Sequence, residues 1–184
     1  MINEAVEYVR REVRDHLGVP DQDVFIGDIH ALKADNKKRG IYISLVNLEE
    51  ENTLKNTSHV IRQNDRAHYK QPPVHLNLYL LFAFNFEKYD VSLLRLSETI
   101  ELFQSKPVLS SETATAGNPF PTTLEKLIFD FHDLNLEQLS YLWGILGGAY
   151  LPSALYKVRM IRVQADTAAA APEITSIRVD TGPR

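Results

Sequence analysis

The stretch Val-His-Leu-Asn-Leu-Tyr-Leu-Leu-Phe-Ala-Phe-Asn-Phe, residues 74–86, decides the fold of this chain. Its even positions are all large and apolar, whereas its odd positions are mixed and include His75, Asn77, Tyr79 and Asn85. An apolar residue at every second position is typical of a β-strand with one fully buried face. Such a strand would be about 40 Å long, well beyond the usual length. We therefore expect it to be the central strand of the domain.

The residues before this strand predict one helix and several shorter strands. Apolar residues three and four positions apart indicate an amphipathic helix over 2–17, with Glu7 and Arg11 spaced for an ion pair and with Gly18 and Pro20 ending it. Strands are expected over 24–29 and 40–48, and the polar turn between them predicts a hairpin. A further strand is expected near 59–62, and residues 64–73 are expected to be a polar linker.

After the central strand, the chain alternates between helices and strands. A helical stripe follows Asp90, a candidate N-cap, and stops at Pro107. Residues 110–123 form a long polar loop, and 124–131 alternate as a strand does. Asn135 and Gln138 are placed for a capping box that begins a helix carrying Trp143, which we interpret as a core residue. Residues 153–164 form the last expected strand.

This order of elements predicts an α+β fold with a mixed, largely antiparallel β-sheet flanked by about three α-helices. Residues 1–164 are expected to form this domain. Residues 165–184 are expected to be a C-terminal extension, which consists of an Ala-rich linker and a segment that could add as a strand. No internal repeat is visible.

Composition sets several limits on function. The formal net charge of −4 gives no reason to expect a nucleic-acid partner. The chain has no cysteine, which excludes a disulfide framework, a thiol nucleophile and a cysteine zinc site, and which fits a cytoplasmic origin. No secretory signal is recognisable, and the longest apolar stretch is too short and too polar for a membrane helix. We expect no membrane partner.

The sequence offers no strong catalytic signal. It contains neither a phosphate-binding loop nor a dinucleotide motif, and its six histidines lack metal-ligand spacing. His132 and Asp133 are the most enzyme-like pair, but neighbouring side chains on an extended segment point to opposite sides. Asp130 and Asp133 are better explained as a polar approach to a helix N-terminus. We therefore expect no enzyme activity, no cofactor and no metal.

Four segments together carry a resemblance to a known family. They are Pro72–Leu81, Leu102–Leu109, Leu136–Trp143 and Tyr150–Arg159, and their order and spacing matter more than any single motif. The chain resembles the tail-cap, or tail-terminator, proteins of extracellular contractile injection systems of the antifeeding-prophage and virulence-cassette type. The resemblance covers roughly Ile2–Val163 and does not include the tail after Ala165.

The resemblance implies a structural role. A protein of this family forms a ring, expected to be hexameric, at the end of a contractile tube-and-sheath particle distal to the baseplate. There it ends polymerisation of the inner tube and anchors the last sheath ring. The implied partners are other copies of the chain, the inner tube protein and the sheath protein. Assembly is expected in the bacterial cytoplasm, before the cap becomes part of a released or cell-associated particle.

Two segments are our candidates for becoming ordered only on assembly, because they contain few large apolar residues that would hold them down in a single chain. They are the loop 110–123 and the tail after Ala165. Within the tail, residues 174–179 are β-prone, and we expect them to add as an edge strand to a neighbouring cap or sheath subunit. The expected contact residues are Asn118, Phe120, Ile174, Ile177 and Val179. On the central strand, Leu81 and Ala83 imply cover over the middle of the odd-numbered face.

Two other interpretations stay open at this point. One is a small enzyme or ligand-binding domain, which would be favoured by a buried cluster of His132, Asp130 and a nucleophile. The other is the terminator or completion protein of a contractile-tailed phage. That protein would differ mainly in its biological setting and little in its physical role.

Overall fold

A computed structural model describes residues 1–34, 39–51, 60–63, 66–70, 74–147, 149–163 and 168–170. Four α-helices lie in this part of the chain, one more than the sequence predicted: α1 (Ile2–Leu17), α2 (Ile29–Ala34), α3 (Tyr89–Ser105) and α4 (Leu136–Ile145). The strands are β1 (Val24–Ile26), β2 (Gly40–Glu50), β3 (Val60–Gln63), β4 (Arg66–Lys70), β5 (Val74–Asn85), β6 (Val108–Ser110), β7 (Lys126–Phe131), β8 (Ser153–Val163) and β9 (Ala168–Ala170).

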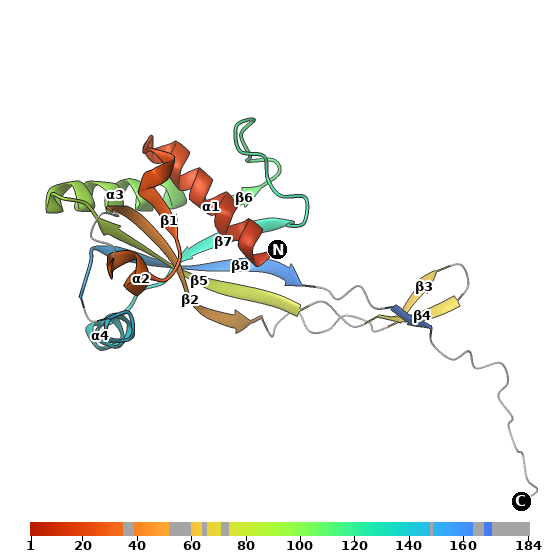
Figure 1. The fold of residues 1–184 in the computed structure, drawn as a ribbon. Helices are drawn as coiled ribbons and strands as arrows, with labels where there is room; N and C mark the ends of the chain where they lie inside the picture. The colour runs from red at the N-terminus through yellow and green to blue at the C-terminus, as the bar shows by residue number, and fades with distance from the viewer. Residues whose placement is uncertain are drawn as a thin grey trace, which may run out of the picture.

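Six strands form the main sheet in the order β1-β2-β5-β8-β7-β6. The β1–β2 pair is parallel, and every other neighbouring pair is antiparallel. The predicted central strand is confirmed, because β5 runs for 12 residues between β2 and β8. The short strands β3, β4 and β9 form a second sheet that lies beyond the Val74 end of β5 (Figure 1). The mixed α+β fold is thus as expected.

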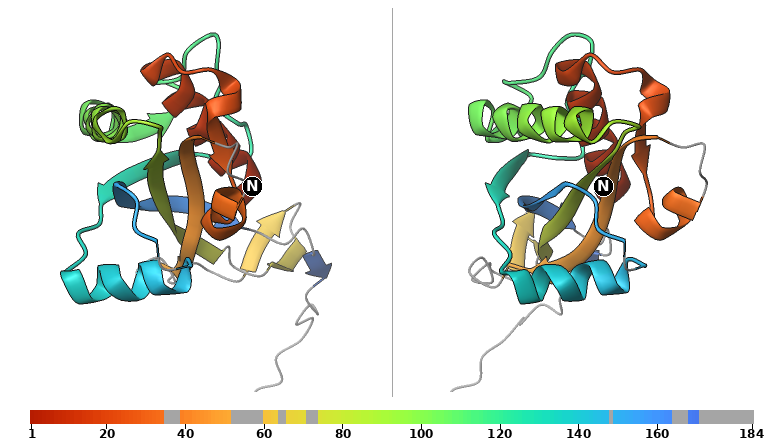
Figure 2. Two further views of the ribbon diagram at one scale, coloured as in Figure 1. Left: turned by 60° about the vertical axis from the view of Figure 1, so that its left-hand side comes forward. Right: turned by 90° about the vertical axis from the view of Figure 1, so that its left-hand side faces the viewer.

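Helices cover both faces of the main sheet. Figures 1 and 2 show α1 and α3 on one face, and α2 and α4 on the other. The even-numbered side chains Leu78, Leu80, Phe82 and Phe84 are buried under α1 and α3, as their alternation predicted. Burial of each such side chain stabilises the fold by about 1.5–3 kcal/mol.

The opposite face of β5 is also covered, but only in the middle. Leu81 and Ala83 are buried with Ile29 of α2 and Trp143 of α4 in a second, smaller core. The prediction of cover over this face is confirmed, and so is the core position of Trp143. Toward the Val74 end the face becomes polar, and Tyr79 donates a hydrogen bond to Glu49 at 2.9 Å.

The first helix has the predicted bounds but different polar contacts. It ends at Gly18, whose φ of 60° and bond from its N–H to the Arg14 carbonyl form a left-handed cap. Glu7 pairs with Arg10 at 3.0 Å, and not with Arg11 as the sequence spacing predicted. Arg11 instead donates to Asn118 at 2.7 Å. Local spacing could not reveal this partner, because it lies far away in the sequence.

The predicted hairpin between residues 24–29 and 40–48 is wrong. These segments pair in parallel, with Val24 opposite Ile41, and the helix α2 lies in the connection between them. A parallel pair needs a crossover connection and cannot be joined by a tight turn. The helix escaped prediction because six residues give less than two turns, too few to show a period. Its fully buried Ile29 holds it against the sheet.

Several smaller differences concern short elements. Strand β4 lies within the predicted linker 64–73, β6 follows Pro107, and β9 lies in the Ala-rich stretch after residue 164. Helix α3 begins at Tyr89 with Lys88 at the N-cap, so Asp90 is not its cap. The capping box of Asn135 and Gln138 on α4 is confirmed. Strand β9 pairs with β4, while the division of the chain at residues 164 and 165 stays a prediction.

Candidate interaction surfaces

Two of the expected contact residues, Asn118 and Phe120, are buried against other parts of their own chain. The Asn118 side chain is fully buried; its amide donates to a Glu12 carboxylate oxygen at 2.9 Å and its oxygen accepts from Arg11 at 2.7 Å. Phe120 packs edge-on against the Tyr8 ring, with ring centroids 4.9 Å apart. Both residues therefore attach their loop to α1, and their contact with another subunit stays a prediction.

The loop that carries them is packed in the single chain, contrary to the expectation that it orders only on assembly. Phe120 within the loop and Leu124 directly after it are both buried in the larger core. Beneath the loop, Glu12 is nearly buried and also pairs with Lys106 at 3.2 Å. Burial, together with the nearby Glu12 charge, raises the pKa of the Tyr8 hydroxyl, which therefore stays neutral. The sequence argument noted that the loop has few large apolar residues. It did not foresee that Phe120 and Leu124 are enough to pack the loop against the rest of the single chain.

We predict that Asn118→Ala lowers the free energy of unfolding by about 1–3 kcal/mol, because it leaves Glu12 buried with one polar partner fewer. Chemical denaturation measures the change, and limited proteolysis should show faster cleavage within residues 111–123. Asn3→Ala is the matched control, since Asn3 is exposed on α1 and its loss should change little. Equal stability of the two variants would contradict the anchoring role.

The remaining expected contact residues, Ile174, Ile177 and Val179, lie outside the described residues. Their assignment as contacts with a partner stays a prediction.

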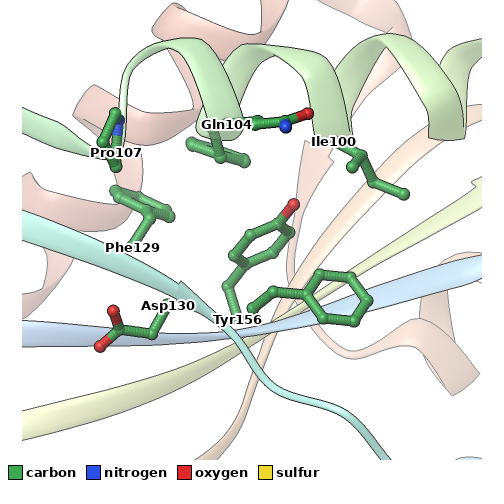
Figure 3. Close-up of a pocket in the computed structure, with 8 residues that line it drawn as sticks. Ile100, Gln104, Pro107, Phe129, Asp130 and Tyr156 are labelled. Carbon is green, nitrogen blue, oxygen red and sulfur yellow. The ribbon is translucent and has the colours of Figure 1, made fainter.

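An aromatic hollow of about 480 Å³ lies between the end of α3 and strands β7 and β8. Figure 3 shows the Tyr156 side chain standing between Ile100 and Gln104 above and the strand below. Burial raises the pKa of Tyr156 to about 12, so its hydroxyl is a neutral hydrogen-bonding group at physiological pH. Asp130 at the rim is paired with Arg159 at 2.5 Å. The hollow is suited to an apolar or aromatic side chain of a partner and offers no activated nucleophile.

Helix α4 exposes apolar side chains along both margins of its buried stripe. On one margin Leu136 is 84% exposed, and with Tyr150 and Trp143 it borders a shallow hollow of about 380 Å³. On the other margin Ile145 is 83% exposed. Residues nine positions apart on a helix lie on opposite sides, so these are two separate surfaces. Single exposed apolar side chains are ordinary, but Leu136 and Ile145 each border an apolar hollow, and an apolar patch of this kind is suited to a protein contact.

The second margin of α4 borders a groove at the edge of the main sheet, which we call the β2-edge groove. It has a volume of about 710 Å³ and is lined by residues of α1, α4, β2 and the end of β1: Ile2, Asn3, Val6, Ile26, Gly27, Asp28, Ser44, Leu45, Val46, Leu142, Ile145 and Leu146. Its lining is mostly apolar, with Asn3, Asp28 and Ser44 as the polar side chains. Sequence reasoning missed this groove, because its walls come from four segments that are distant in the chain.

The enzyme-like residues do not assemble into a catalytic set. His132, Asp133 and Ser153 line one pocket of about 140 Å³, but no hydrogen bond joins them. The His132 ring instead packs edge-on against Tyr79 at 5.1 Å between centroids, and Asp130 is held by Arg159. Within the described residues, no cluster of His, Asp and Glu has the geometry of a metal site, and no helix is long and apolar enough to cross a membrane.

The described fold and its surfaces define a protein whose exposed features are suited to contacts with other proteins. A family model places it more closely: residues 4–176 match the Pvc16 N-terminal domain, so the chain belongs to that family. This match reaches past Val163, where the resemblance seen in the sequence ended. The recognition of the tail-cap family is thereby confirmed.

Solved structures share the fold. One is the sheath/tube terminator of an extracellular contractile injection system, PVC, in its extended state, with a TM-score of 0.63 and 15% identity over 100% of this chain. Another is the tube-terminating cap of the anti-feeding prophage, with a TM-score of 0.67 and 12% identity over 98% of this chain. The chain spans 64% and 61% of the length of those two chains. No curated protein sequence matches it.

Proposed function

We propose that this protein is the structural cap of a contractile injection particle. It forms a ring, which we expect to be hexameric, at the end distal to the baseplate, where it terminates the inner tube and anchors the last sheath ring. The observation that carries the proposal is the family match over residues 4–176, supported by a fold shared with a sheath/tube terminator and a tube-terminating cap. The role needs no catalytic residue.

The surfaces are consistent with this role. A terminator has to present one surface to the tube and no second equivalent one, since otherwise polymerisation would continue. Head-to-tail contacts between copies meet this requirement when the rotation between them closes a ring. Such a contact uses two different surfaces of each copy, and the two margins of α4 supply apolar candidates on separate sides. We propose assembly in the bacterial cytoplasm, with the tube and sheath proteins as the other partners.

Deletion of the gene, followed by imaging of the particles, tests the cap function. We expect tubes and sheaths of uncontrolled length without the protein, and normal length when the gene is restored. Particles of unchanged length after the deletion would overturn the proposal.

We further predict that Leu136→Glu removes the cap from particles without unfolding the protein, because Leu136 is exposed beside Tyr150 and Trp143. The charge would have to be buried in the contact, which is unfavourable. Complementation of the deletion strain, scored by particle length, measures the effect. Leu94→Glu is the matched control, since Leu94 is an exposed leucine on α3 at the opposite face of the sheet. A Leu136→Glu protein that restores normal length would rule out a contact at this margin.

A further inference from the structure

The β2-edge groove contains a stretch of strand edge that is open to a further strand. Strand β1 pairs with β2 only as far as Ile26, which lies opposite Ile43. The next residue, Gly27, donates its N–H to the Ile43 carbonyl at 3.1 Å. Beyond Ile43, no strand in the described part of the chain pairs with residues 44–46 on the β1 side. The edge of β2 is therefore available there for backbone hydrogen bonds.

The walls of the groove are suited to an extended segment. Ile2 and Val6 of α1 lie on one side of the open edge and Ile145 of α4 on the other, and Leu45 is 42% exposed between them. An added strand would complete the backbone hydrogen bonds of β2 and would place alternate side chains against the two helices. An exposed apolar strand edge without such cover promotes unwanted pairing.

We propose that residues 174–179 of a second copy of this chain occupy the β2-edge groove as an added strand. The segment reads Ile-Thr-Ser-Ile-Arg-Val, so Ile177 and Val179 fall on one face of a strand and Ile174 and Arg178 on the other. Arg178 is the only charged residue of the segment, and Asp28 is the only charged residue among the described residues that line the groove. The segment and the groove therefore match in apolar character, and their charges are opposite.

The chain between β9 and residue 174 is too short to bring Ile174 beside Leu45 of the same chain. Strand β9 ends at Ala170, which lies opposite His68 in the small sheet beyond the Val74 end of β5 (Figure 1). Leu45 lies opposite Leu80, and the six residue steps from Val74 to Leu80 span about 20 Å. The four steps from Ala170 to Ile174 cover at most about 14 Å. We therefore assign the occupant to a neighbouring copy, and such a head-to-tail contact is of the kind that closes rings.

Cysteine cross-linking tests the proposal, because the chain has no cysteine of its own. One purified full-length chain carries Leu45→Cys, and a second chain of different mass carries a single cysteine at one position from 174 to 179. The two are mixed at about 100 μM, where contacts of modest affinity are populated. We expect a covalent product of one chain of each kind, with a yield that alternates with period two along the segment. Leu94→Cys replaces Leu45→Cys in the matched control and should give no such alternation.

Three results would overturn the proposal: no mixed product, a yield without alternation, or, in a chain carrying both cysteines, a product formed only within one chain. An unlabelled peptide of residues 173–180 should lower the yield, whereas a peptide of the same composition in scrambled order should not. The experiment uses neither tube nor sheath, so its failure would leave the proposed cap function standing. Failure of the gene-deletion test would likewise leave this contact between copies intact.

Discussion

Phe82→Ala should lower the free energy of unfolding by about 3–5 kcal/mol, because it opens a cavity at the centre of the larger core. Phe82 lies on β5 and is completely buried. Its ring centroid is 5.3 Å from that of Phe103 on α3 and 5.7 Å from that of Tyr156 on β8. The substitution therefore removes contacts that join the central strand to a helix and to a neighbouring strand at once.

Phe131→Ala is the matched control for this prediction. It removes the same atoms from a strand residue whose ring also contacts Tyr156, but Phe131 is 57% exposed. We expect a loss below about 1 kcal/mol for this variant, since most of its apolar surface is already in water. Denaturant unfolding measures both changes, and the midpoint temperature of Phe82→Ala should fall by about 6–20 °C.

If Phe82→Ala does not fold, Phe82→Leu supplies a milder test with an expected loss of about 1–2 kcal/mol. Equal losses for Phe82→Ala and Phe131→Ala would contradict the position of Phe82 at the centre of the core.

The sequence predicted those parts of the fold that depend on local periodicity. The alternation in residues 74–86 identified both faces of β5, since a residue's side of a strand follows directly from its position in the sequence. The capping box at Asn135 was recognisable because its two partners are three residues apart. These features need no knowledge of distant segments.

Features that join distant segments could not be predicted in this way. The parallel pairing of β1 with β2 depends on a short helix whose only strong signal is one buried isoleucine, Ile29. The contact of Asn118 with Arg11 and Glu12 joins residues 107 and 106 positions apart. The β2-edge groove likewise combines α1, β2 and α4. One chain without aligned relatives carries no pattern for such contacts.

Gly40→Ala should destabilise the fold by several kcal/mol, because the first residue of β2 has no room for a side chain. A Cβ atom at this position would overlap the backbone carbonyl oxygen of Asp23, which a side-chain rotation cannot relieve. The backbone φ of 153° is also one that residues other than glycine rarely adopt, which adds about 1–3 kcal/mol of strain. Relief would require β1 to move away from β2, where Val24 lies opposite Ile41.

Gly144→Ala is the matched control and should change stability in the opposite direction. Gly144 lies in α4, and a Cβ atom added there meets no other atom within 4 Å. Alanine favours the helix over glycine by about 0.5–1 kcal/mol, so this variant should be slightly more stable than the parent chain. Denaturant unfolding of both variants measures the difference. A Gly40→Ala protein as stable as the parent would show that the Asp23 carbonyl does not approach Gly40 as closely as described.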